Sequence, residues 1–113
     1  MVYAFAIYTL TTIVMLIISR SALNKAPAGS RLPMNWGWGG QVDWDAPAKW
    51  AVFIIPLITI VTFAFVFLMM VIVSIDTNEP EWIHTAIAGI LCAAFLLIHV
   101  GHLYFALRHV NKG

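Results

Sequence analysis

Histidines are the side chains of this sequence best suited to chemistry, because imidazole binds metals and moves protons near neutral pH. The chain has four, His84, His99, His102 and His109. His99 and His102 are three positions apart, so in a helix they share a face, roughly 60° apart about the axis. Both lie in a long apolar stretch, where an ionisable residue is a candidate functional site. We therefore take His99 and His102 as candidate cofactor-binding residues.

Three interpretations of this pair stay open. In the first, a neutral imidazole hydrogen-bonds to a carbonyl or hydroxyl group of a neighbouring helix. In the second, one imidazole is the axial ligand of haem or another tetrapyrrole. The third is a metal or proton-relay site, although zinc needs three or four ligands and only Cys92 lies nearby. We predict no cofactor, with a tetrapyrrole as the alternative.

The composition indicates which solvent surrounds these residues. Of the 113 residues, 62% are hydrophobic and 10% are charged, whereas soluble domains carry about 25% charged residues. Lipid must therefore surround most of the chain, which we take as a single membrane domain, residues 1–113. A net charge of +1 provides no basic surface for nucleic acid. The partners that we expect are membrane lipids and other membrane protein subunits.

Three apolar segments are long enough to cross a bilayer, since a core of about 30 Å needs about 20 residues in a helix. The predicted spans are residues 2–19, 50–75 and 82–107. A loop over 20–49 and a short acidic turn over 76–81 connect them. The predicted fold class is an all-α integral membrane protein with three transmembrane helices. A Trp/Gly/Pro-rich loop, re-entrant or lying on the membrane surface, joins the first two.

The charges predict the orientation, because Lys and Arg near the ends of spans stay on the cytoplasmic side. All six basic residues lie in the first loop or the C-terminal tail: Arg20, Lys25, Arg31, Lys49, Arg108 and Lys112. The other face has none and carries acidic residues in the turn over 76–81. We expect a multipass protein of the bacterial inner membrane with its N-terminus outside and its C-terminus in the cytoplasm. Since no basic residue precedes position 20, we do not expect the first segment to be a cleaved signal peptide.

The loop between the first two spans is too apolar for a plain linker. Trp36, Trp38 and Trp44 favour the membrane interface or a protein contact, so we predict them as interaction residues. Asp43 and Asp45 lie near Lys49, and we expect them to neutralise one another at the surface.

A set of residues in and after this loop resembles a bacterial membrane domain of unknown function found in SdpI-like immunity proteins. The matching positions are Pro33, Trp36, Gly40, Asp43, Lys49 and Pro56. The resemblance covers the first two spans and the loop, and Asn35 stands where that family usually has histidine. It implies a small multipass protein that acts by binding a partner, with Pro33, Asn35, Gly40, Asp43 and Lys49 as the family motif.

The third span contains a face of small residues. Gly89 and Ala93 are four positions apart, as are Ala88 and Cys92, and such pairs let helices approach closely in lipid. We predict that Gly89 and Ala93 pack against the other spans or against another protein.

Three functions remain open from the sequence. The favoured one is a non-enzymatic membrane protein that acts through protein–protein contacts, as an accessory subunit of a larger complex or an immunity-like protein. The alternatives are a tetrapyrrole-binding electron-transfer or pigment-associated subunit, and an oligomeric transporter or channel component. We do not predict an enzyme, because no nucleophile–base set or phosphate loop is present.

Overall fold

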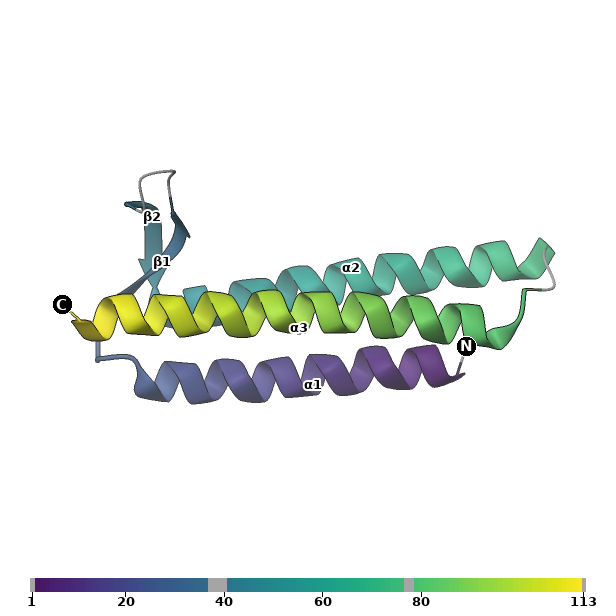
Figure 1. Cartoon of the computed structure of the whole chain (residues 1–113), viewed down its shortest axis with the longest axis horizontal. Helices are drawn as coiled ribbons and strands as arrows, with labels where there is room; N and C mark the ends of the chain where they lie inside the picture. The colour runs from purple at the N-terminus through teal and green to yellow at the C-terminus, as the bar shows by residue number, and fades with distance from the viewer. Residues whose placement is uncertain (1, 37–40, 77–78, 113) are drawn as a thin grey trace.

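The computed structural model of the chain describes residues 2–36, 41–76 and 79–112. In these residues the elements follow the order α1 (Val2–Lys25), β1 (Arg31–Trp36), β2 (Val42–Pro47), α2 (Ala48–Asp76) and α3 (Glu81–Lys112). The three helices run side by side along the long axis of a particle of 55 × 29 × 17 Å (Figure 1). All three are long and apolar enough to cross a membrane. The structure is therefore that of a mostly helical multipass membrane protein.

Each helix extends beyond the apolar segment that predicted it. The first continues to Lys25, so the predicted loop over 20–49 begins with more than a turn of helix. Its end follows from the sequence, since Pro27 disfavours helix at the residue before it. Gly29 then adopts a φ of 74°, which glycine tolerates best. The third helix begins at Glu81, directly after Pro80, with its acidic side chain in the first turn, where the helix dipole favours negative charge.

A two-stranded antiparallel hairpin of β1 and β2 occupies the segment that we expected to be a loop. It pairs Arg31 with Pro47 and Leu32 with Ala46, and its register shifts between Pro33 and Trp36. The hairpin projects sideways from the end of the bundle where α1 ends and α2 begins (Figure 1). The prediction of an all-α chain was incomplete in this respect.

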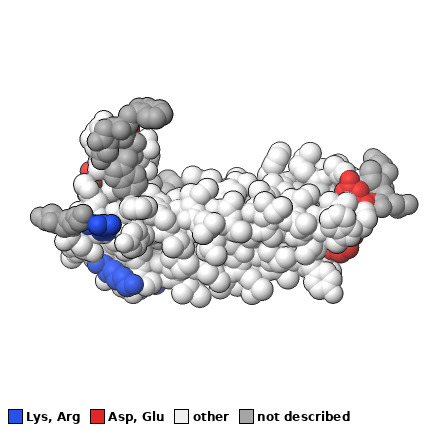
Figure 2. Space-filling model, viewed as in Figure 1, with Lys and Arg blue, Asp and Glu red and all other residues white. Residues whose placement is uncertain are grey.

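The charges separate the two ends of the bundle. On the face drawn in Figure 2, Lys and Arg gather near the hairpin, and Asp and Glu gather at the opposite end, apart from red atoms beside the hairpin. We call the first the basic end and the second, which holds Glu79 and Glu81, the acidic end. The N-terminus lies at the acidic end and the C-terminus at the basic end (Figure 1).

Helix α1 packs against both other helices, whereas α2 and α3 make fewer contacts with each other. The described residues form two clusters of buried side chains. At the basic end, Leu32 of the hairpin packs among small residues and Leu103. At the acidic end, Tyr8 and Phe63 pack against Ala88 and Cys92.

Candidate functional site

Pro56 creates an unsatisfied backbone group near the start of α2. Proline has no N–H, so the carbonyl four residues earlier, that of Val52, loses its partner in the helix. In lipid an unpaired carbonyl is costly, because no water replaces the missing bond. The Ser19 hydroxyl of α1 lies 2.5 Å from the Val52 oxygen and donates a hydrogen bond to it. A side chain of one helix therefore satisfies the backbone that proline leaves open in another.

His99 joins the same hydrogen bonds from α3. Its Nε2 lies 2.9 Å from the Ser19 oxygen. A hydroxyl has a single proton, and that of Ser19 is directed to Val52. The Ser19 oxygen therefore accepts from His99, and Nε2 is the protonated ring nitrogen. The resulting chain, His99 to Ser19 to Val52, takes one group from each helix and is fully buried at Ser19, Val52 and His99.

His102, three residues further along α3, holds the hairpin. Its Nε2 lies 3.1 Å from the carbonyl oxygen of Pro33 in β1, so the ring donates to the strand. Leu32 beside it is 0% exposed and packs in the cluster of the basic end. The two candidate histidines thus use Nε2 for contacts within the protein. The sequence brings them to one helix face, but their partners depend on the packing of the other elements.

The family-motif residues lie mainly along the hairpin. Asn35 donates weakly to the Asp43 carboxylate across the strands, at 3.5 Å. Lys49 lies over the ring of Trp50, 5.8 Å from its centroid. We expected Asp43 and Asp45 to pair with Lys49. This was wrong for Asp45, because its carboxylate pairs with Arg31 at 2.6 Å. The register explains this difference, since Arg31 is paired with Pro47 and Pro33 with Asp45 on the adjacent strand.

Of the predicted interaction residues, Trp44 is 53% exposed on the hairpin. The side chain of Trp36, together with Trp38 and Gly40, lies outside the described residues. Gly89 and Ala93 are exposed on the outer face of α3, whereas Ala88 and Cys92 face the core. The inner small pair is thus the one that packs within this bundle.

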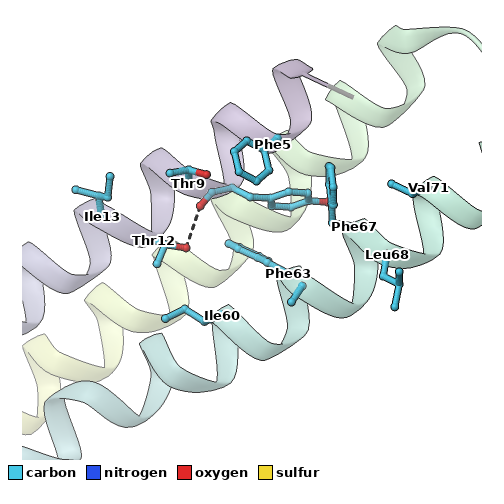
Figure 3. A pocket seen from close by; sticks show the side chains of 11 residues that line it. Phe5, Thr9, Thr12, Ile13, Ile60, Phe63, Phe67, Leu68 and Val71 are labelled. Atoms are coloured by element: carbon cyan, nitrogen blue, oxygen red, sulfur yellow. Dashed lines mark hydrogen bonds between the residues drawn. The ribbon is translucent and has the colours of Figure 1, made fainter.

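A groove that we did not predict from the sequence lies between α1 and α2 (Figure 3). Its volume is about 550 Å³, and aromatic residues of both helices form much of its wall, with Phe5 and Phe67 facing each other at 5.6 Å. A second groove of about 270 Å³ continues it at Ile60 towards Trp50. We call the two grooves together the α1–α2 seam. The polar Thr12 hydroxyl at its wall bonds back to the Tyr8 carbonyl at 2.9 Å, so it does not disturb the apolar surface.

No family model, curated protein or solved structure matches this chain. The resemblance to the domain of the SdpI-like immunity proteins therefore stays a prediction.

Proposed function

We propose that this chain is a small non-enzymatic membrane protein that acts through protein–protein contacts within the bilayer. In this proposal it is an accessory subunit of a larger complex or an immunity-like protein that binds a membrane-active partner. The observation that carries the proposal is the α1–α2 seam, an apolar surface lined by helices that leave it open on one side. Pockets lined by aromatic anchors are typical of the energetic centres of protein interfaces.

The length of the seam favours a helix as its occupant. From Trp50 to Val71, the α2 residues that line it extend over about 32 Å at about 1.5 Å per residue. This is close to the bilayer core of about 30 Å, whereas one acyl chain reaches across a single leaflet. Contacts on this scale suit a transmembrane helix of another protein.

The contacts of the polar groups inside the bundle favour a protein that acts through protein–protein contacts over a tetrapyrrole-binding subunit or a transporter. His99 and His102 use Nε2 for Ser19 and for the Pro33 carbonyl, and Nε2 is the atom that a haem ligand would have to turn outward. A transport pathway would need polar groups along it, and the Ser19 and His99 side chains are instead engaged between helices. We therefore place the tetrapyrrole and transporter alternatives behind the interaction protein.

The proposed orientation places the basic end in the cytoplasm of a bacterial cell, following the rule for Lys and Arg. The hairpin then lies at the cytoplasmic interface, with the exposed ring of Trp44 at the level that indole prefers. Trp82, 69% exposed at the acidic end, occupies the outer interface.

Photo-crosslinking in cells tests the proposal. A photoreactive residue at Phe67 lies in the seam, and one at Ile90, which is 71% exposed on α3, is the matched control. We expect one discrete heterologous adduct from Phe67, and a stoichiometric companion of the same identity after purification in mild detergent. Ala64→Trp, which fills the seam, should remove that companion, and Ile90→Trp should not. A lone monomer, a homodimer or equal adducts from both positions would contradict the proposal.

A further inference from the structure

A separate groove lies between α2 and α3 at the acidic end. Its volume is about 290 Å³, and its walls are mostly apolar, with two polar residues, Glu79 and His84. The apolar lining residues are Phe65, Val66, Met69, Met70, Val73 and Ile87. The groove shares no lining residue with the α1–α2 seam, so it is an independent feature.

His84 is buried in this groove without the partners that a buried imidazole normally has. The residue is 4% exposed, and its Nδ1 makes no hydrogen bond within the described residues. Buried polar groups are nearly always hydrogen-bonded, and leaving one unpaired costs about 1–3 kcal/mol. The rings of His99 and His102 hydrogen-bond through Nε2, whereas the ring of His84 makes no hydrogen bond within the described residues.

The neighbouring carboxylate sets which nitrogen carries the proton. His84 Nε2 lies 3.9 Å from Oε2 of Glu79, too far for a hydrogen bond but close enough to orient the ring. An ionised carboxylate only accepts hydrogen bonds, so the proton of a neutral ring belongs on Nε2. Nδ1 then has a free lone pair. The polar part of the groove therefore offers two hydrogen-bond acceptors, His84 Nδ1 and the Glu79 carboxylate, and a ligand that fits it carries hydrogen-bond donors.

We propose that this groove binds a membrane amphiphile with a primary ammonium head. Three N–H donors and a positive charge match the acceptor of His84 and the carboxylate of Glu79, whose side chain is 39% exposed. The apolar tail lies along the α2 and α3 walls. Met69 and Met70 line the groove, and methionine repacks readily around a ligand. An aminophospholipid and a free long-chain amine share this chemistry.

Paired probes test the proposal on the full chain in phosphatidylcholine nanodiscs. Dodecylamine and dodecyltrimethylammonium have the same tail and charge, but only the amine has N–H donors. We expect the amine to bind about tenfold tighter and to shift the ¹⁵N resonance of His84 Nδ1. His84→Leu should remove the difference, while His84→Asn, which keeps an acceptor near the position of Nδ1, should retain part of it.

A second pair of variants tests the role of the Glu79 carboxylate. Glu79→Gln should weaken both probes, while Glu81→Gln, an acidic residue outside the groove, should leave both unchanged. Retention of phosphatidylethanolamine over phosphatidylcholine in native mass spectrometry would identify a lipid as the source, and binding of the free amine alone would identify a soluble amine. Equal binding of the two probes, or a preference that survives His84→Leu, would overturn the proposal. Neither result bears on the contacts of the α1–α2 seam.

Discussion

The two ends of the bundle differ in how many hydrogen bonds join their buried polar side chains to other elements. At the basic end, Ser19 and the two inner histidines each make a hydrogen bond to another element. At the acidic end, the Tyr8 hydroxyl has no hydrogen-bond partner within the described residues, and neither does Nδ1 of His84, a property that Nδ1 of His99 shares at the basic end. Both tyrosine and histidine are nevertheless at most 5% exposed there.

The difference indicates how each end is held together. Small residues at the basic end allow the helices to approach, and hydrogen bonds then fix their relative positions. Aromatic rings hold the acidic end, where Tyr8 and Phe63 lie 4.6 Å apart and Phe63 and Phe95 lie 5.5 Å apart in an edge-on arrangement. The ligand site that we propose lies at the acidic end, in the groove beside the unpaired Nδ1 of His84.

The largest effect should come from His99→Ala. It removes a fully buried ring and leaves Ser19 without its donor, so we expect a loss of about 2–4 kcal/mol in the free energy of unfolding. Steric trapping in bicelles measures this quantity. Leu97→Ala, at a position 73% exposed, is the control and should change stability little. Equal losses for both variants would show that the basic end is not fixed by this ring.

A smaller and local effect is expected from His102→Leu. The ring donates a hydrogen bond to the Pro33 carbonyl of the hairpin, and buried Leu32 also anchors the strand, so the loss should be about 1 kcal/mol. Hydrogen exchange should increase over Leu32–Asn35 and stay unchanged in the middle of α1. Faster exchange throughout the bundle would mean that His102 supports the helices rather than the hairpin.

The smallest effect is expected from Tyr8→Phe. Its hydroxyl has no hydrogen-bond partner in the part of the chain that the structure describes, so removing it should leave stability unchanged or raise it by up to about 1 kcal/mol. The same unfolding measurement serves here. A loss of more than about 1 kcal/mol would show that the hydroxyl is bonded and would remove the contrast between the ends.

The sequence predicted the helices well because lipid imposes a simple rule on long apolar segments. It did not predict where the helices end, because Arg20 and Lys25 are polar but still favour helix. The hairpin was missed for a different reason. Apolar residues do alternate along both strands, RLPMNW and VDWDAP. Pro33 and Pro47 argued against strands, because proline cannot donate to the hydrogen-bond ladder.

The hydrogen-bond partners of His99 and His102 could not be predicted from the sequence, because they depend on how the elements pack. Pro56 already implies that the Val52 carbonyl is free, and this could have been inferred from the spacing alone. Which hydroxyl reaches that carbonyl depends on how α1 packs against α2. The choice between the two pairs of small residues on α3 also depends on packing. We predicted that Gly89 and Ala93 make the helix contact, whereas Ala88 and Cys92 face the core.

The most direct test of the hydrogen-bonded basic end is a double-mutant cycle of Ser19→Ala and Pro56→Ala. Alone, Ser19→Ala should cost about 1–3 kcal/mol of unfolding free energy, since it leaves the Val52 carbonyl and the His99 N–H unpaired. Pro56→Ala restores an N–H to α2 that can bond Val52 within the helix. In that background we predict that the cost of Ser19→Ala falls by about 1 kcal/mol. Fully additive effects of the two substitutions would contradict the role of Ser19 as the partner of the carbonyl that Pro56 leaves open.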